Sequence, residues 1–327
     1  MPFKANAAPR HHIPKQKRKV TNWTAYNASL RQRGSLTLWF SEEAIAGWRA
    51  APRTTRGGQA WYSPLAILTA LTLKAVLRLA LRQTEGLIGS IIALLGLSLA
   101  VPTFSTLSRR AETVDVPRLR PCSSHDADSE PLHLLVDSTG LKLCGAGEWL
   151  VEKHGTKRRR SWRKLHIGVD ASTGAIVAAM LTTKDVDDAS EVGPLLAQVD
   201  GPLASFTADG AYDQDSVYDV VTERDPEAAV IVLPRATAAF SETAQTEPTL
   251  RDRYLQCIAE KGRMGWQKAS GYNVRSRVEA AIERYKQVIG DGLHFCKDER
   301  RATEIAVAVL ALNRMSELGR PISVRIK

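Results

Sequence analysis

Two aspartates in this 327-residue sequence follow predicted strands, a position from which carboxylates can take part in phosphodiester chemistry. Asp137 closes the apolar run 132–136 and Asp209 closes the run 205–208, and both runs are predicted to be short strands. Ligands of open α/β sheets bind beyond strand ends, where side chains of neighbouring strands converge. We therefore expect the two carboxylates to lie side by side if their strands are neighbours.

The chemistry that such carboxylates can serve is phosphoryl transfer with two metal ions. Mg²⁺ and Mn²⁺ prefer hard oxygen ligands, and two ions about 3.5–4 Å apart can stabilise both the attacking and the leaving oxygen. Three carboxylates are enough if one bridges the two ions and each of the others binds one ion. One ion would activate water or a 3′-hydroxyl. Because only two acids have been identified so far, the third must come from elsewhere in the chain.

The third acid is expected on the amphipathic helix predicted at residues 271–286. At about 100° per residue, four of its side chains fall within about 60° of one another: Tyr272, Arg275, Glu279 and Lys286. Glu283 lies close to the same stripe, so helical periodicity does not choose between Glu279 and Glu283. A solvated face with an Arg275–Glu279 ion pair four residues apart explains the same pattern.

The elements expected to position these acids form one α/β domain over residues 131–327. Strands are predicted at 132–139, 164–171, 175–183, 205–213 and 228–234, and helices at 188–199, 214–224, 271–286 and 304–318. This order indicates a mixed sheet flanked by helices. Residues 235–270 are polar and irregular, and we interpret them as a small insertion.

Other acids of this domain have simpler explanations. Asp170 also closes a predicted strand, but the residues "STG" follow it closely, which favours a role in capping a tight hairpin turn. Asp185, Asp187 and Asp188 precede a predicted helix and are expected to cap it or the turn before it. Glu148 and Glu152 lie in a charged loop and have no clear partner.

The N-terminal part is predicted to be helical and basic. Residues 1–60 contain eleven Lys and Arg against two Glu, and we expect a basic arm with little periodicity. Residues 61–113 predict a small all-helical domain, with Ser63 and Thr103 as helix caps and a helix-turn-helix-like outline that ends in Arg109 and Arg110. DNA reading and plain helix packing explain this outline equally well. Residues 114–130 are rich in Pro, Ser and Asp and predict a linker.

A second basic segment lies close to Asp137 in the chain. Residues 153–164 hold seven Lys and Arg and no acid, which favours phosphate contacts over a solvated hairpin loop. The candidates for DNA contact are Lys157, Arg158, Arg159, Arg160, Arg163 and Lys164. Two tryptophans, Trp162 and Trp266, could stack on displaced bases, but core packing is the favoured role for both.

The overall composition agrees with a polyanionic partner. The net charge is +10 and the isoelectric point is about 9.6. Four cysteines without a Cys-x-x-Cys pair, and seven histidines without zinc spacing, argue against a disulfide scaffold or a structural zinc site. The first twenty residues have no apolar core, and no apolar run reaches the roughly 18 residues that span a bilayer. We expect a reduced, soluble, cytoplasmic protein that is not associated with a membrane.

The acids and the residues around them resemble those of a known family. The spacing Tyr272, Arg275, Glu279, Lys286 is similar to the Y-R-E-K signature of DDE transposases from bacterial insertion sequences. The acid before "ST" at Asp137, the "DGAYD" around Asp209 and the "WRKLHIGVD" hairpin are similar to the same group, and so is "LRQTEGLIGSIIALLGL…TLSRR". The chain resembles transposases of insertion-sequence family five from end to end, with the first sixty residues matching least.

This resemblance implies an RNase H-like catalytic domain preceded by a DNA-binding domain, in a bacterial protein associated with the nucleoid. It implies that Asp137, Asp209 and Glu279 bind two Mg²⁺ or Mn²⁺ ions, and that Tyr272, Arg275 and Lys286 contact DNA near the cut. A homodimer would pair two terminal inverted repeats, cleave the 3′ ends and join them to target DNA. Two rival hypotheses remain: a metal-dependent structure-specific endonuclease without strand transfer, and a non-enzymatic DNA-binding regulator whose acids are structural.

Overall fold

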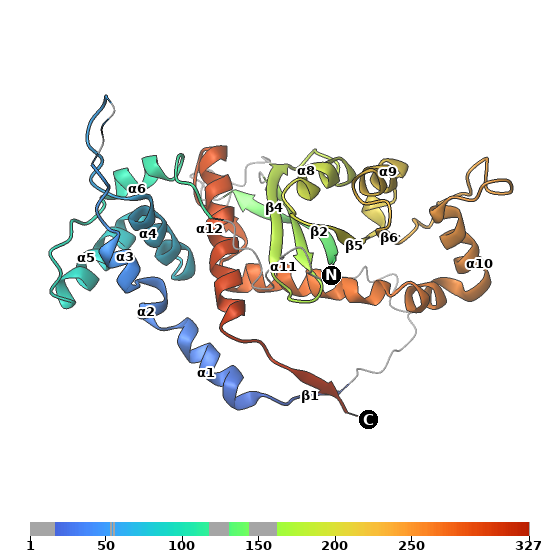
Figure 1. Cartoon of the computed structure of the whole chain (residues 1–327), viewed down its shortest axis with the longest axis horizontal. Coiled ribbons are helices and arrows are strands. Elements are labelled where there is room, and N and C mark those ends of the chain that lie inside the picture. Colours follow the sequence, from blue (N-terminus) through green and yellow to red (C-terminus); the bar gives the residue numbers. More distant parts are fainter. Residues whose placement is uncertain (1–16, 53, 55, 118–130, 144–161, 327) are drawn as a thin grey trace, which may run out of the picture.

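A mixed β-sheet forms the centre of the C-terminal part of the chain (Figure 1). The structure is a computed structural model that describes residues 17–52, 54, 56–117, 131–143 and 162–326. The strands lie in the order β4-β3-β2-β5-β6, namely Ile176–Thr183, Trp162–Asp170, Leu132–Leu143, Leu203–Ala208 and Ala229–Val232. β2 pairs antiparallel with β3, and β3 with β4, whereas β5 and β6 continue the sheet in parallel. This is the mixed sheet of the expected RNase H-like domain.

The longest strand, β2, differs from its prediction. The expected strand ends at residue 139, but β2 continues to Leu143 because β3 pairs with it as far as Lys142. The short β7 (Gly292–Leu293) also pairs with this far end. Asp137 therefore lies in the middle of a strand and not at its end. β5 stops earlier, at Ala208, so Asp209 follows the end of a shorter neighbouring strand.

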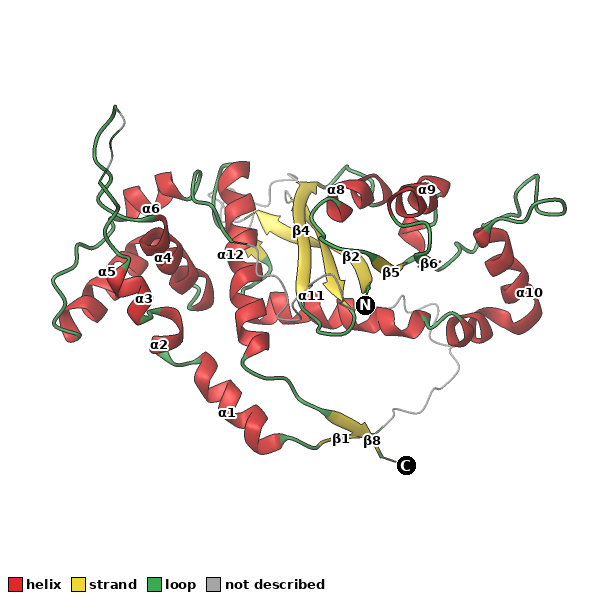
Figure 2. Cartoon of the chain, in the orientation of Figure 1, coloured by secondary structure: helices red, strands yellow, loops and turns green. Residues whose placement is uncertain are grey.

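Helices cover both faces of the sheet, as Figure 2 shows. One face carries α8 (Val192–Leu196) and α9 (Asp215–Arg224), and the other carries α11 (Ser276–Val288) and α12 (Asp298–Glu317). Successive side chains of a strand point to opposite faces. Val136 accordingly joins the core under α8 and α9, whereas Leu135 and Leu141 join the core under α11 and α12. Asp137 belongs by this alternation to the face that α11 covers.

The N-terminal region is more ordered than the sequence predicts. Residues 17–50 contain β1 (Arg18–Val20), α1 (Trp23–Arg33), α2 (Leu36–Trp39) and α3 (Glu42–Ala46), where we expect an arm with little periodicity. The elements are short, and their aromatic residues do not follow a helical repeat. They are held by tertiary contacts instead, because Trp39, Phe40 and Trp48 are buried in the core of the helical part. β1 pairs antiparallel with β8 (Ser323–Arg325) near the other end of the chain.

Three further helices complete the helical part: α4 (Pro64–Val76), α5 (Leu81–Leu94) and α6 (Phe104–Arg110). The hydroxyls of Ser63 and Thr103 cap α4 and α6 as expected, accepting hydrogen bonds from the amides of Ala66 and Thr106. The break between α4 and α5 falls at Arg78, which has φ 53°. The side chain of Arg78 reaches the carbonyl of Val288 at 2.9 Å, a contact that local sequence does not reveal.

Among the described helices, none is by itself long and apolar enough to cross a membrane. The pair α4 and α5 would satisfy such a test of length and composition only if counted together, and the two helices are bent by 113° at the break between them. Much of α4 is buried among other helices of the same chain.

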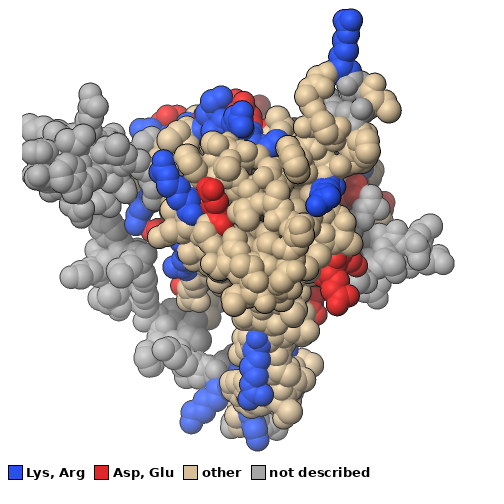
Figure 3. Space-filling model, turned by 90° about the vertical axis from the view of Figure 1, so that its left-hand side faces the viewer, with Lys and Arg blue, Asp and Glu red and all other residues tan. Residues whose placement is uncertain are grey.

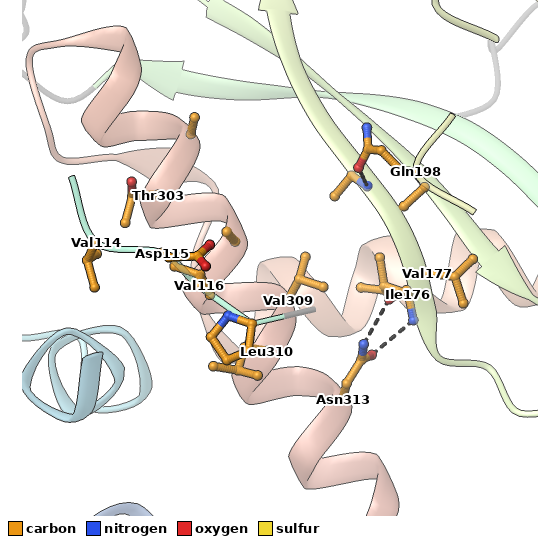
Figure 4. A pocket seen from close by; sticks show the side chains of 15 residues that line it. Val114, Asp115, Val116, Ile176, Val177, Gln198, Thr303, Val309, Leu310 and Asn313 are labelled. Carbon is orange, nitrogen blue, oxygen red and sulfur yellow. Dashed lines mark hydrogen bonds between the residues drawn. The ribbon is translucent and has the colours of Figure 1, made fainter. Parts of the chain in front are cut away.

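Helix α12 joins the helical part to the sheet. Its residues Val307, Ala311 and Met315 share a core with Ile67 and Leu71 of α4. On its sheet side, the Asn313 amide accepts a hydrogen bond from the amide of Ile176 (2.9 Å) and donates one to its carbonyl (2.8 Å), as Figure 4 shows.

The Asn313 side chain thus satisfies backbone groups at the open edge of β4, an edge that would otherwise be free to pair with another strand. A cavity of about 320 Å³ lies beside this contact, between residues 114–117, β4 and α12.

The expected insertion at residues 235–270 contains a long helix that the sequence does not predict. α10 spans Leu250–Ala269 and is kinked at Gly262, whose φ of 71° lies in the region that favours glycine. Its start is a capping box in which Thr249 and Asp252 bond each other's backbone amides. In Figure 1 this segment extends from the sheet on the side away from the helical part. The kink divides the helix into two short pieces, which weakens its periodic signal.

Candidate active site

The segment expected to be one helix from residue 271 is in fact a turn and a helix. Gly271 adopts φ 72°, and a 3₁₀ turn, η4 (Tyr272–Arg275), leads into α11 at Ser276. Arg275 therefore stands at the junction, one residue before the α-helix begins. Glu279 lies in the first turn of α11, and its position follows from the helix that packs on the sheet.

The structure brings the three predicted acids together around Arg275. Nη2 of Arg275 donates to Oδ2 of Asp137 at 2.9 Å and to Oδ2 of Asp209 at 3.5 Å. Nη1 of the same side chain donates to Oε1 of Glu279. Glu283, the rival that periodicity leaves open, accepts a hydrogen bond from Gln287 at 2.9 Å on an exposed part of α11. The tertiary structure thus places Glu279 in the cluster and Glu283 beside it.

The backbone holds the second oxygen of each aspartate. Oδ1 of Asp137 accepts from the amide of Ser138 at 2.8 Å, and Oδ1 of Asp209 accepts from the amide of Ala211 at 2.9 Å. The acids differ in exposure: the side chains of Asp137, Asp209 and Glu279 are 14%, 36% and 59% exposed. Two carboxylates that the backbone anchors and a third, more exposed one on α11 therefore line the site.

The burial of Asp137 changes its acidity. Removal from water raises the pKa of this carboxyl to about 6, although Arg275 and the amide of Ser138 act in the opposite direction. The negative charges of Asp209 and Glu279 add to the increase. Carboxylates that crowd together in this way are stabilised in the charged form by a cation, because desolvation and mutual repulsion both disfavour the anions.

The donor set suits a divalent cation, although its present spacing does not form a metal site. Among the described residues, no group of three or more His, Cys, Asp and Glu side chains lies close enough to hold an ion. The chemistry nevertheless fits, since Asp137, Asp209 and Glu279 offer the hard carboxylate oxygens that Mg²⁺ and Mn²⁺ prefer. The Arg275 guanidinium stands between them and contacts all three.

Tyr272 is placed differently from the expectation that it faces DNA. Its side chain packs inward, with 8% of the residue exposed, and its ring centroid lies 5.3 Å from that of Trp266. Trp266 in turn contacts Tyr254 of α10, also at 5.3 Å between centroids. Burial raises the pKa of Tyr272 to about 12. The turn η4 thus directs this ring into an aromatic cluster at the base of α10, and core packing is also what we expect for Trp266.

Lys286 lies further along α11 and outside the acid cluster. Its charge acts on Asp291, whose pKa is lowered mainly by a hydrogen bond from Lys142 and also by the charge of Lys286. Lys142 and Asp291 form an ion pair at 2.6 Å. Lys286 is half-buried and adds positive charge near the far end of β2.

The remaining predicted DNA contacts divide into three groups. Arg163 pairs with Asp298 at 3.1 Å and Lys164 with Asp188 at 3.2 Å, so both already neutralise acids of the same chain. Arg109 is exposed on α6 and Arg110 is half-buried beside it. Lys157, Arg158, Arg159 and Arg160 lie outside the described residues. Seen from the end of the helical part, Lys and Arg are spread around the rim of a mainly uncharged face (Figure 3).

A polar cluster behind the acids has no counterpart in the sequence predictions. Nδ1 of the buried His166 lies 3.6 Å from Asp188, and Nε2 lies 2.8 Å from the hydroxyl of Thr182. Burial lowers the pKa of His166. In β3, His166 faces Ser138, the neighbour of Asp137. Asp188 is expected only to cap a turn or helix, and its pairing with His166 of β3 follows from the tertiary fold and not from any local pattern.

The fold and the site together define a class of protein. A mixed sheet with helices on both faces, and three carboxylates that converge from β2, the end of β5 and α11, is an RNase H-like domain with an acid triad. Comparison with known families adds the specific assignment. Residues 128–314 match a family model described as transposase DDE domain, and residues 31–146 match a second model with the same description.

The first of these matches covers more than half of the chain, and the chain belongs to the DDE transposase family. The chain is also similar to a solved structure, a cryo-EM structure of the piggyBac transposase synaptic complex with hairpin DNA. The superposition covers 92% of this chain and 78% of the piggyBac chain, with 11% sequence identity and a TM-score of 0.42.

Proposed function

We propose that this transposase acts on the ends of a bacterial insertion sequence of family five. It binds the terminal inverted repeats, cleaves DNA at the ends of the element and joins the 3′ ends to target DNA. The observation that carries the proposal is the convergence of Asp137, Asp209 and Glu279 on one cation, Arg275, from three separate elements. The order and spacing of these acids with the Y-R-E-K residues support it further.

Each residue has a part in the proposed reaction. Two Mg²⁺ or Mn²⁺ ions, held by the three acids, would supply the Lewis acid that stabilises the attacking and leaving oxygens. Asp137 is positioned by the paired strands of the sheet, and Asp209 is positioned by the amide of Ala211. Glu279 is positioned by the first turn of α11 and is the most exposed of the three acids. Arg275 and Lys286 provide positive charge near the phosphates.

DNA binding is proposed to use several surfaces besides the acid cluster. The exposed basic residues of α10 are Arg253, Lys261, Arg263 and Lys268. Together with Arg109 on α6 and a net charge of +10, they favour contacts to phosphate that weaken steeply as salt is raised. A homodimer in the synaptic complex would hold two ends together for joining.

The proposal is tested with single alanine variants of Asp137, Asp209 and Glu279. We expect each to lower end cleavage and strand joining by about 10²-fold or more, since each removes one ligand of the metal ions that would stabilise the transition state. Binding to the terminal repeat should persist. Glu283→Ala is the matched control, because it removes an acid four residues from Glu279 on the same helix and should leave cleavage unchanged. Full cleavage by the three triad variants would refute the assignment.

Strand transfer is tested separately with a pre-cut terminal repeat and a supercoiled target plasmid. The transposase should produce joined product in the presence of Mg²⁺ or Mn²⁺. Cleavage of intact ends without any joined product would instead indicate a structure-specific endonuclease. Tight end binding with neither product, and with no response to metal, would indicate a DNA-binding regulator whose acids are structural.

A further inference from the structure

The guanidinium of Arg275 lies between the three acids that are proposed to hold metal ions. It contacts all three acids of the cluster, and its side chain is 14% exposed. Each aspartate offers one oxygen to a backbone amide, Oδ1 in both cases, and the other, Oδ2, to Arg275. A cation that approaches Oδ2 of either aspartate therefore meets the positive charge of Arg275.

The hydrogen-bond donors of Arg275 are also incompletely satisfied. Its Nε is buried and has no hydrogen-bond partner among the described residues. A buried donor without a partner is unfavourable, so this arrangement has a built-in preference for a ligand that could use all the guanidinium donors. A phosphate group is such a ligand, because Arg binds phosphate in a bidentate way and with a charge-assisted hydrogen bond at each contact.

Three carboxylates and one guanidinium form an unequal balance of charge. While Arg275 remains, it reduces the repulsion among Asp137, Asp209 and Glu279 and keeps them near one another. If Arg275 left without replacement, three like charges would face each other, one of them largely buried. Withdrawal of Arg275 is therefore unfavourable unless a divalent cation replaces it, and binding of a divalent cation is unfavourable while Arg275 stays in place.

We propose that Arg275 is an internal counter-cation that occupies the acid cluster until a DNA phosphate withdraws it, so that DNA and metal bind with positive coupling. The inference rests on the proposed function for the identity of the acid site, and goes beyond it in making Arg275 a switch between two sets of anions. No covalent step is involved. In the DNA-free protein the arginine holds the triad, and in the DNA complex it binds phosphate and the acids accept metal.

The test measures metal binding directly, with Ca²⁺ or Mn²⁺ and titration calorimetry, with and without a short duplex DNA. In the wild-type protein the duplex should tighten metal binding by about tenfold, within the range typical of coupled sites. In Arg275→Gln, metal should bind more tightly than in the wild type without DNA, and the duplex should change the affinity little. Arg314→Gln, which removes an exposed arginine in the last turn of α12, should keep the full coupling.

Melting temperatures guard against a folding defect. Arg275→Gln should melt lower than wild type without metal and recover when Ca²⁺ is added, because the metal replaces the missing charge. Equal or weaker metal binding by this variant without DNA, or unchanged coupling, would overturn the inference. The proposed function fails in a different way: triad alanine variants would then bind metal as well as the wild type. Wild-type metal binding that depends on the triad but not on DNA rejects the switch alone.

Discussion

At the scale of single residues, the site depends on side chains that join distant parts of the chain. Arg275 connects β2, the end of β5 and α11 through its contacts with three acids. Tyr272, three residues earlier, has the opposite character, because its ring turns away from the acids into an aromatic cluster. Neighbours in one short signature thus serve two purposes: one binds charge and the other fixes the turn that presents it.

The burial of Tyr272 leads to a prediction that separates packing from DNA contact. Tyr272→Ala should lower the free energy of unfolding by about 3–5 kcal/mol, the usual effect of removing a buried aromatic ring. Tyr272→Phe keeps the ring and should leave stability nearly unchanged. Urea denaturation measures both variants. If Tyr272→Phe folds normally but loses affinity for the terminal repeat, the hydroxyl contacts DNA despite its burial.

At the scale of elements, the α10 segment shows how a polar stretch acquires order. Asp252 is 2% exposed and accepts hydrogen bonds from the amides and hydroxyls of Ser241 and Thr249. These bonds hold its pKa well below the usual value for aspartate, because they favour the charged form. One carboxylate thereby joins the start of α10 to the preceding loop, and the basic residues of α10 depend on that junction for their position.

Asp252→Asn is therefore expected to destabilise the α10 segment, by about 1–3 kcal/mol, since part of the buried donor set loses its acceptor. The folded pKa is lowered, so the contribution of Asp252 is fully present above the unfolded pKa of 3.8 and is lost as the pH falls toward the folded value. The difference between the variant and the wild type should be constant from neutral pH to about 5 and shrink below about 4.

Limited proteolysis at pH 7 and pH 3.5 measures this difference in residues 235–270. Asp215→Asn is the control, because its side chain is exposed at the start of α9. A difference that is equally large at both pH values would contradict the role of the ionised carboxylate.

At the scale of the whole molecule, one buried ion pair connects the helical part to the catalytic part. Lys74 of α4 lies 3.4 Å from Glu304 of α12, and both side chains are 8% exposed. His294 also donates to Glu304, and Phe295 packs under the Lys74 ammonium at 5.0 Å. Burial alone would raise the pKa of Glu304, but the contacts with His294 and Lys74 outweigh it and lower the pKa. This group therefore stays charged and needs its partners.

Removing one partner should be more harmful than removing both. Lys74→Met is expected to destabilise the protein by about 3–5 kcal/mol, because it leaves the Glu304 charge buried with a weaker set of partners. The double variant Lys74→Met, Glu304→Leu should recover much of that loss, since an apolar pair fits the same buried space. Guanidinium denaturation measures the free energy of unfolding of both variants. The single variant Glu304→Leu completes the double-mutant cycle. Additive effects would show that the two residues do not act as a pair.

The amino-acid sequence by itself was enough to name the candidate acids, to give their order in the chain and to predict the class of fold. Apolar runs that alternate with helical patterns identify a mixed sheet, and the residue spacing at 272–286 indicates a transposase family that the comparisons confirm at the level of DDE transposases. Helix caps at Ser63 and Thr103 were also readable, because a cap depends on its own next few residues. These features are local, or are repeated closely enough to be recognised from spacing.

Only the tertiary structure decided how the acids meet. β2 extends past Asp137 because β3 pairs with it, and the α-helix begins after Arg275 because a turn at Gly271 precedes it. Periodicity could not separate Glu279 from Glu283, which differ by one turn, but the packing of α11 on the sheet brings the first into the cluster. The placement of Arg275 among three acids depends on contacts between residues 66 and 138 positions apart in the chain, which no local pattern records.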